Sequence, residues 1–487
     1  MRCRAVLLLL AVTGLAGCSF LPWYSYTNKE SDSSTTAVPR PVENFYRAVS
    51  LRPKLPSDVP SGASKASIAN VPWQISAACR TVAAPQSRES IPEHCRDDRF
   101  VSLAISGGGS RASIFGAAVM FELQRYGLLQ HVDLVSCVSG GCLTAAYYAL
   151  SCDDPEDQQA CPLTTNGAAR YAWREEAVYP LLERNFLSRW FGNWFWPDNI
   201  LKYWFTYFDR TDIMAETISS NLYDKSILDN NQFRFRDLSP SRPNLAINAT
   251  NVTAGKIREF SFTFTPEQFQ KLHSDLDRYP VANAVMASAS FPGAFNYVTL
   301  RDFHEQQYVH LLDGGAYDNL GLNAIKTAME LDTTNTDGPK QRVVIIIDAY
   351  MALDNRMARE AEPRSWTDYV IDSNFFVAYD TLLTSLRATQ LQFAETLLKQ
   401  HRGTLLHISW ENLDKHADPE IAWLGNRLNR IPTSLKIESK SAARLRSAAK
   451  ILVARELKHI LCDPSRQADA QVVRAMLSPQ APALSCG

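Results

Sequence analysis

The sequence has no excess of positive charge and no basic run, the two features that attract a nucleic acid. Its 487 residues include 50 Lys and Arg against 51 Asp and Glu, so the formal net charge is -1. A protein that binds nucleic acid neutralises backbone phosphates with clustered Lys and Arg. We therefore expect no nucleic-acid partner.

Residue spacings typical of metal and nucleotide sites are also absent. No cluster of His, Cys and Asp has the spacing of zinc ligands, and no EF-hand calcium loop occurs. Neither the Walker pattern Gly-x-x-x-x-Gly-Lys-Ser/Thr nor the dinucleotide pattern Gly-x-Gly-x-x-Gly is present. We expect no metal ion and no cofactor.

The N-terminal apolar run, residues 5–12, is too short to span a bilayer. Residues 1–17 instead have the charged, apolar and small-residue regions of a secretory signal. Leu15-Ala16-Gly17-Cys18 resembles the bacterial lipobox, which would make Cys18 the lipid-modified first residue of the mature protein. Several acyl chains on Cys18 would hold it stably at a membrane. An ordinary cleaved signal and a buried apolar N-terminus are the alternatives.

The lipobox resemblance also implies a location. Ser19 follows the cysteine and resembles residues that permit passage to the outer membrane of a bacterium. We therefore expect a lipid-anchored protein of the bacterial cell envelope, at the outer membrane and facing the periplasm.

Besides Cys3 and Cys18, the chain has eight cysteines, an even number compatible with disulfides in an oxidising compartment. Cys137 and Cys142 lie in an apolar segment and are expected to be small buried hydrophobes without a disulfide. The other six lie in turn-rich stretches as near neighbours that we expect to pair locally: Cys79 with Cys95, Cys152 with Cys161, and Cys462 with Cys486.

The composition of the chain changes near residue 99. Residues 18–98 are rich in Ser, Thr, Pro and Lys, a composition that predicts a tether with a few ordered segments. Apolar runs then alternate with helix-like segments, which predicts an α/β three-layer sandwich around a mostly parallel sheet. We assign residues 99–350 to the catalytic core and residues 351–487 to a mainly helical region that completes it. The expected strands are residues 100–105, 132–138, 245–248, 260–264, 309–312, 343–347 and 405–408.

A glycine-rich loop, Ser106-Gly107-Gly108-Gly109-Ser110-Arg111, follows the first of these strands and precedes a helix. Successive glycines let backbone N–H groups turn toward one point, and the helix N-terminus adds positive potential. The loop therefore fits an oxyanion hole, with a phosphate cradle or a simple tight turn as the alternatives.

A serine elbow is predicted at Ser139, between the strand at residues 132–138 and a following helix. A strained strand-to-helix turn exposes such a serine, and small neighbours such as Gly140 and Gly141 relieve the crowding. Cys137 occupies the first glycine position of the Gly-x-Ser-x-Gly pattern, which is a departure from it. The alternative is a chance Ser-Gly-Gly turn.

Asp313 ends an apolar strand and is followed by Gly314 and Gly315. Glycines at this place leave a carboxylate uncovered, as a general base requires. An ordinary Asp-Gly turn is the alternative when this motif is read alone.

The three motifs in this order resemble the patatin-like phospholipase family. The resemblance is strengthened by Asn248-Ala249-Thr250-Asn251 and by residues 287–295, Ala-Ser-Ala-Ser-Phe-Pro-Gly-Ala-Phe. It covers roughly residues 99–348 and fades toward the C-terminus. It implies a patatin-like fold and a phospholipase or lysophospholipase acting on phospholipid or another acyl lipid.

The resemblance also implies a set of roles. Ser139 would be the nucleophile and Asp313 its base in a dyad without histidine. The N–H groups of Gly107, Gly108 and Gly109 would form the oxyanion hole, and Arg111 would steady the loop or meet a lipid phosphate.

Two other functions stay open. A Ser-Asp-His esterase of the α/β-hydrolase type would draw its histidine from those downstream: His401, His407, His416 and His459. A lipoprotein with this fold can also bind lipid or scaffold an envelope complex without catalysis. The aromatic segment at residues 186–208 fits either a packed subdomain or an acyl-chain pocket or membrane-facing surface.

The lipobox resemblance gives a direct test. The Cys18→Ser protein should stay unprocessed or become soluble, and labelled fatty acid should not enter it, because the acyl acceptor is gone. Metabolic labelling followed by fractionation measures both effects. Normal lipid labelling of this variant would contradict the prediction that Cys18 carries the lipid anchor.

Overall fold

A computed structural model describes most of the chain beyond residue 98. The described residues are 27–31, 99–156, 161, 163–164, 167, 169–206, 208–223, 232–239, 242–253, 260–333, 341–349, 373–400 and 403–486. Several sequence expectations lie outside them: the lipobox with Cys18, most of the tether, Cys79, Cys95 and His401.

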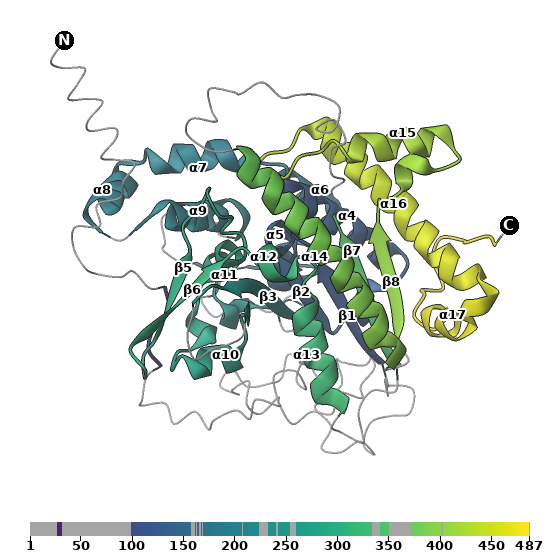
Figure 1. Cartoon of the computed structure of the whole chain (residues 1–487), viewed down its shortest axis with the longest axis horizontal. Coiled ribbons are helices and arrows are strands. Elements are labelled where there is room, and N and C mark those ends of the chain that lie inside the picture. Colours follow the sequence, from purple (N-terminus) through teal and green to yellow (C-terminus); the bar gives the residue numbers. More distant parts are fainter. Residues whose placement is uncertain are drawn as a thin grey trace, which may run out of the picture.

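One sheet organises the fold (Figure 1). Its strand order is β5-β6-β3-β2-β1-β7-β8, with β4 paired to β3. The strands from β3 to β8 in this order are parallel, whereas β4 and β6 run antiparallel to β3, and β5 antiparallel to β6. The strands are β1 (Arg99–Ile105), β2 (Leu134–Val138), β3 (Asn244–Asn251), β4 (Ser261–Thr263), β5 (Val298–Asp302), β6 (Gln307–Leu312), β7 (Gln341–Asp348) and β8 (Thr404–Ser409).

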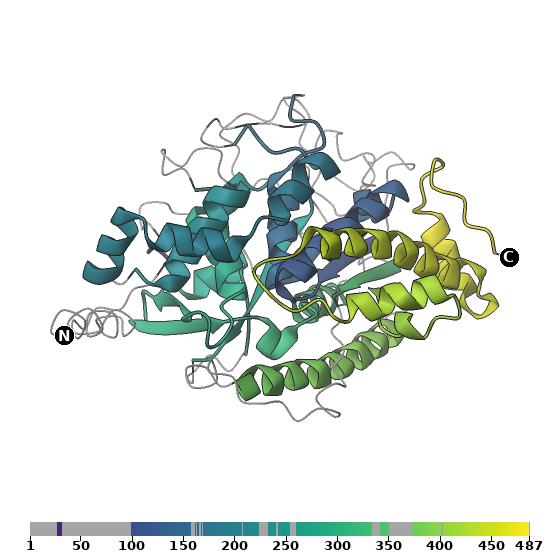
Figure 2. The same cartoon turned by 90° about the horizontal axis from the view of Figure 1, so that it is seen from above.

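Helices cover both faces of the sheet because its central strands are apolar on both sides. In β1, Leu103 and Ile105 join one core, while Phe100 and Ala104 join the other. The larger core is covered by α4 (Gly109–Arg125), α5 (Gly140–Leu150), α11 (Val281–Ser288) and α16 (Ser439–Cys462). The smaller is covered by α13 (Leu322–Thr333) and α14 (Ser373–Gln400), the long green helix at one outer side in Figure 2.

The remaining helices surround this framework. α7 and α8 lie at one end of the molecule and α17 at the other, as Figures 1 and 2 both show. Their bounds are α6 (Glu175–Leu182), α7 (Phe186–Trp194), α8 (Pro197–Phe205), α9 (Arg210–Ile218), α10 (Pro266–Lys271), α12 (Gly315–Asp318), α15 (Pro419–Leu428) and α17 (Gln467–Arg474). The short helical turns are η4 (Leu129–His131), η5 (Ser219–Tyr223), η6 (Phe235–Asp237), η7 (Leu276–Arg278), η9 (Leu413–Lys415) and η10 (Pro464–Arg466).

The α/β three-layer fold with a mostly parallel sheet is confirmed. Each expected strand is present within a few residues, but β5 was missed. Its sequence, Val-Thr-Leu-Arg-Asp, is too short and mixed to stand out, and it exists because β6 supplies an antiparallel partner. The described part of the tether, residues 27–31, lies beside it, where Asn28 accepts a bond of 2.7 Å from Arg301 N–H.

Two of the expected local disulfides are present, Cys152–Cys161 and Cys462–Cys486. The expectation that Cys137 and Cys142 carry no disulfide is wrong. Both side chains are fully buried, but they are bonded to each other with a Cα–Cα distance of 5.0 Å. The end of β2 and the first turn of α5 bring them together across the serine elbow, a geometry that sequence spacing does not reveal. Within the described ranges, no helix has both the length and the apolar character needed to cross a bilayer.

Candidate active site

Ser139 occupies a sharp turn between β2 and α5. Its backbone φ is 49° and ψ is -124°, in a region that L-residues seldom adopt. The N–H of Ser139 donates to Ser288 Oγ at 2.8 Å, and that hydroxyl donates to Asn248 O at 2.5 Å. The strained backbone is therefore held by groups from α11 and β3.

Two glycines beside the elbow allow a close approach of two loops. A Cβ atom on Gly140 would lie 2.0 Å from Gly109 O, and one on Gly141 would lie 2.6 Å from Ser106 O. Both contacts are with backbone, which has little room to move. The glycines therefore let the elbow pack directly against the glycine-rich loop.

Asp313 follows β6 and faces the serine. Ser139 Oγ donates to Asp313 Oδ2 at 2.7 Å, and Gly315 N–H donates to Oδ1 at 2.8 Å. The hydroxyl of Thr250 on β3 fixes the aspartate backbone by donating to Asp313 O at 2.8 Å. Both carboxylate oxygens thus have a partner, and one partner is the proposed nucleophile.

Burial shapes the acidity of this carboxyl group. The side chain of Asp313 is 5% exposed, and this burial raises the pKa of Asp313 to about 6, although hydrogen bonds from Ser139 and Gly315 pull it downward. At neutral pH the group is mostly a carboxylate, but it is far more basic than an exposed aspartate. It is suited to accepting and returning a proton.

The glycine-rich loop between β1 and α4 lies against this pair. Gly108 has φ of 139° and Gly109 has φ of 57°, conformations that favour glycine. The N–H of Gly107 donates to Asn319 O at 3.0 Å, so it is already engaged. Within the described residues, the N–H groups of Gly108 and Gly109 have no hydrogen-bond partner and stand at the first turn of α4.

Arg111 is 3% exposed and connects the glycine-rich loop to the segment before α16. Its guanidinium donates to Ile431 O at 2.7 Å and to Thr433 Oγ1 at 3.2 Å. The N–H of Ser110 donates to Ser434 O at 2.8 Å, which adds a second connection to the same segment. Of the two roles expected for Arg111, the contacts favour steadying the loop.

A pocket of about 580 Å³, including its open mouth, lies over the Ser139–Asp313 pair. The glycine-rich loop, Asn319, α14 and the segment before α16 all contribute to its lining. Phe291 and Leu383 are its large apolar groups. The lining residues are Gly107, Gly108, Arg111, Ser139, Phe291, Asp313, Asn319, Asp348, Ala349, Leu383, Thr384, Arg387 and Thr433.

A charged cluster forms one side of the pocket. Arg387 Nε donates to Asp348 Oδ2 at 2.7 Å, and Arg387 Nη2 donates to Glu411 Oε2 at 2.7 Å. His407 Nε2 lies 2.9 Å from Asp348 Oδ2. Burial would raise the pKa of Asp348, but the contacts with His407 and Arg387 outweigh it and hold that pKa below the usual value. The lining therefore combines apolar side chains with ion-paired groups.

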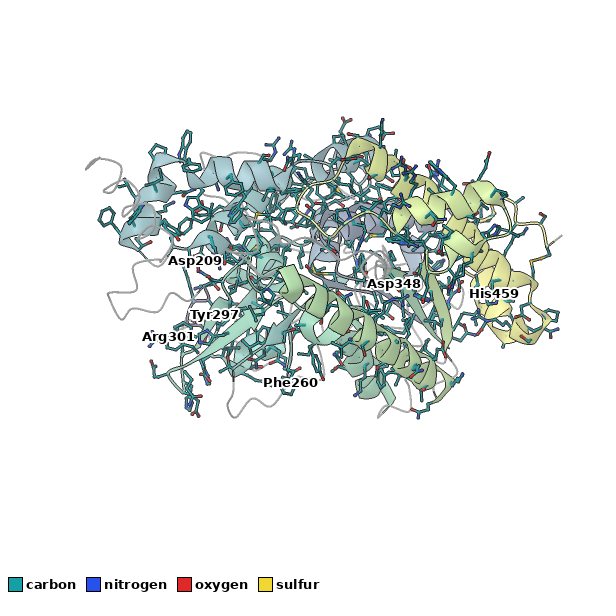
Figure 3. All side chains as sticks on the ribbon, turned by 45° about the horizontal axis from the view of Figure 1, so that its top comes forward. Asp209, Phe260, Tyr297, Arg301, Asp348 and His459 are labelled. Carbon is teal, nitrogen blue, oxygen red and sulfur yellow. A yellow bond between two sulfur atoms is a disulfide. The ribbon has the colours of Figure 1, made fainter. Side chains whose placement is uncertain are left out.

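The described histidines do not join Ser139 and Asp313. His407 pairs with Asp348, while His416 and His459 are exposed. Figure 3 places Asp348 in the middle of the molecule and His459 near its C-terminal end. No described group of three or more His, Cys, Asp or Glu residues has the geometry to hold a metal ion.

Sequence reasoning missed several groups that build this site. Ser288 and Asn248 were noted only as parts of motifs, and their bonds to the elbow require three-dimensional knowledge. Asn319 and Arg387 carried no sequence signal at all. Asn319 follows Asp313 by six residues, whereas Arg387 comes from α14, a helix far along the chain.

The part of the chain that contains Ser139 and Asp313 is similar to a known family. The family model described as Patatin-like phospholipase matches residues 103–325, from within β1 to within α13. This segment contains the glycine-rich loop, Ser139 and Asp313. The fold is an α/β fold, and over the matched residues the sequence is similar to that family. The comparison with curated proteins found no match.

Solved structures are similar at low identity. Human GIVD cytosolic phospholipase A2 has 12% identity and a TM-score of 0.42, over 77% of this chain and 62% of that chain. The human enzyme in complex with Methyl gamma-Linolenyl Fluorophosphonate has 16% identity and a TM-score of 0.39, over 78% and 59%. VipD from Legionella pneumophila has 13% identity and a TM-score of 0.23, over 78% and 79%. The chain thus spans about three fifths of the phospholipase A2 structures.

Because Asp313 is buried, its carboxylate form is expected to lower the free energy of unfolding at neutral pH. The folded chain binds the carboxyl proton more tightly than the unfolded chain, so stability falls as pH rises from about 4 to about 6. The raised pKa corresponds to about 3 kcal/mol at neutral pH. We expect Asp313→Asn to raise the free energy of unfolding at pH 8 by roughly 1 to 3 kcal/mol, with little gain at pH 4.

Denaturant unfolding of parent and variant at both pH values measures the effect. Ser139→Ala is the control, because it removes a hydrogen bond to the carboxylate and leaves the charge buried; it should gain no stability at pH 8. An Asp313→Asn protein less stable than the parent at pH 8 would contradict the prediction.

Proposed function

We propose that the chain is a serine lipid acyl hydrolase of the patatin-like phospholipase A or lysophospholipase type. The observation that carries this proposal is the 2.7 Å hydrogen bond from Ser139 Oγ to Asp313 Oδ2 in the pocket. The match of residues 103–325 to the patatin-like phospholipase family supports a lipid ester as the substrate class.

In the first half of the reaction, Ser139 Oγ attacks the carbonyl carbon of the ester as its proton moves to Asp313 Oδ2. The tetrahedral intermediate places negative charge on the former carbonyl oxygen. The N–H groups of Gly108 and Gly109, at the positive end of α4, are the donors available to it, and Gly107 shapes the wall beside them. Protonated Asp313 then gives the proton to the leaving alcohol, and the acyl group stays on Ser139.

The second half repeats this chemistry with water. Asp313 takes a proton from a water molecule that attacks the acyl carbon, and the carbonyl oxygen again meets the glycine N–H groups. Collapse of the intermediate releases the fatty acid, and the proton returns from Asp313 to Ser139 Oγ. No metal or cofactor enters either half.

The cell envelope is the proposed place of action. A lipid anchor on Cys18 would keep the enzyme at a membrane that holds its substrate, and disulfides Cys152–Cys161 and Cys462–Cys486 fit an oxidising compartment. The partners that we propose are therefore an acyl lipid and the membrane itself.

The two alternative functions receive less support. A Ser-Asp-His triad needs a histidine at the serine hydroxyl, whereas Ser139 Oγ is bonded to Asp313 directly. A non-catalytic lipid-binding protein would not need an activated serine. Labelling by a fluorophosphonate tests this point, because the reagent requires a nucleophilic serine and should be lost in Ser139→Ala.

The dyad predicts non-additive losses. Ser139→Ala, Asp313→Asn and the double variant should each lose ester hydrolysis by several powers of ten, to similar residual rates, because the two groups act as one unit. Steady-state kinetics on a phospholipid panel with mass-spectrometric product analysis measures the loss. Arg111→Ala should be intermediate, since it removes charge-assisted bonds worth about 1.5 to 3 kcal/mol but neither reacting group.

Histidine variants are the matched controls. Substitution of His407, His416, His459 or His401 by Gln should leave turnover within about tenfold, as is usual for groups outside the chemistry. If a folded histidine variant were as inactive as Ser139→Ala, the dyad hypothesis would be wrong and the Ser-Asp-His triad would take its place.

The raised pKa of Asp313 predicts the pH profile. Because the base must be a carboxylate, kcat/KM should be level above pH 7 and fall about tenfold per unit well below pH 6. A soluble ester substrate separates this effect from changes in a lipid surface. A rising limb centred near pH 4, the value of an exposed aspartate, would show that burial does not set the acidity of the base.

A further inference from the structure

Large apolar side chains stand out into solvent along α7 and α8. Isolated exposed apolar residues are ordinary, but six within fifteen residues mark an interaction site. We call them the aromatic surface: Phe191 (48% exposed), Phe195 (72%), Trp196 (65%), Leu201 (59%), Trp204 (37%) and Phe205 (80%).

The same two helices are attached to the protein through their other side. Asn193 Nδ2 donates to Thr217 Oγ1 at 3.1 Å, and the buried Asn199 donates to Asn193 Oδ1 at 3.0 Å. Trp190 Nε1 donates to Arg210 O at 3.0 Å, at the start of α9. Polar amides thus face inward while rings face outward. None of these bonds uses a side chain of the aromatic surface, so the outward rings are not needed for them.

The start of α7, which precedes the aromatic surface in the chain, lies close to the pocket. The N–H of Phe186, at the start of α7, donates to Leu435 O at 3.1 Å, two residues from Thr433 of the pocket wall. The ring of Trp190 packs on Phe295 at 5.2 Å, four residues from Phe291, which also lines the pocket. Figure 3 shows Asp209, the N-cap of α9, at the end of the molecule that carries α7 and α8, with Asp348 toward the middle.

The segment that carries the aromatic surface has few charged side chains to oppose contact with an apolar phase. Residues 191–205 contain two charged residues, Asp198 and Lys202. Their side chains pair at 2.6 Å, so the segment has no net charge. The ammonium of Lys202 also lies 5.3 Å from the ring centre of Phe208, which keeps it on the flank of the rings.

We propose that the aromatic surface is a membrane-binding face that enters the boundary between head groups and acyl chains of a phospholipid bilayer. Trp and Phe on short amphipathic helices are the side chains that favour this boundary. Rings that are two thirds or more exposed protrude and suit a deformable lipid phase. The proposal rests on the proposed function, because a lipid substrate must pass from the bilayer to the pocket.

Vesicle binding tests the surface separately from catalysis. Ser139→Ala is combined with Cys18→Ser in every protein, so neither hydrolysis nor an attached acyl chain contributes. The triple variant Phe195→Ser, Trp196→Ser, Phe205→Ser is compared with Trp423→Ser, a 52% exposed Trp on α15. With vesicles of phosphatidylethanolamine and phosphatidylglycerol, we expect the triple variant to lose at least tenfold in partition coefficient and Trp423→Ser to stay within twofold.

Activity gives a second measurement on proteins that keep Ser139. The triple variant should lose at least tenfold in kcat/KM on vesicle-borne phospholipid and stay within twofold on a monomeric short-chain ester, which also shows that it is folded. Single Phe205→Ser, at the most exposed ring, should show a smaller loss in the same direction. If no protein hydrolyses any ester but the vesicle difference remains, the surface stands and the proposed function fails.

Other results would overturn the proposal. Equal vesicle binding by parent and triple variant would remove the aromatic surface as the membrane contact. Sedimentation velocity could instead show that the parent is a dimer and the triple variant a monomer. Together with equal vesicle binding, that result would make the surface an interface between copies of this chain.

Discussion

The hydrogen bond between Ser139 and Asp313 depends on β3, the strand that lies between them. β2 runs parallel to β3 with Val138 opposite Asn248, and β6 runs antiparallel to β3 with Leu312 opposite Thr250. Continuing each register by one residue brings both Ser139 and Asp313 level with Ala249, on opposite sides of β3. A shift of either register would separate the two groups, so strand pairing sets the distance between the proposed nucleophile and its proposed base.

β3 also supplies the groups that fix this geometry. Asn248 Nδ2 donates to Cys137 O at 3.0 Å, and Asn248 O accepts from Ser288, which holds the elbow N–H. Two residues on, Thr250 holds the backbone of Asp313. These bonds offset two unfavourable features of the site, a strained serine and a buried carboxylate. The disulfide across the elbow adds a covalent restraint between β2 and α5.

The sequence was most informative where function depends on local backbone shape. A glycine-rich loop, a serine followed by glycines and an Asp-Gly-Gly turn each mark a special conformation, and each lies at a strand end as expected. The rule that ligands gather at the carboxyl ends of parallel strands does not account for Asp313, because β6 is antiparallel. The N–H of Gly107 was expected to contribute to the oxyanion hole, but it donates to Asn319 O, a contact between segments that spacing cannot show. The Cys137–Cys142 bond escaped prediction for the same reason.

The proposed reacting groups and much of the pocket wall come from different parts of the chain. Ser139, Asp313 and the glycine-rich loop lie within residues 103–325, whereas Leu383, Thr384, Arg387 and Thr433 come from later elements. Arg387 is tied to Asp348 on β7 and to Glu411 beyond β8, so the position of α14 is coupled to the sheet edge. The segment that holds Arg111 continues through Leu435 to α7. Under the proposed function, contacts of these later elements with the substrate would change which lipid fits without moving the serine or the aspartate. The same short stretch, from Ile431 to Leu435, contacts both Arg111 behind the glycine-rich loop and the start of α7.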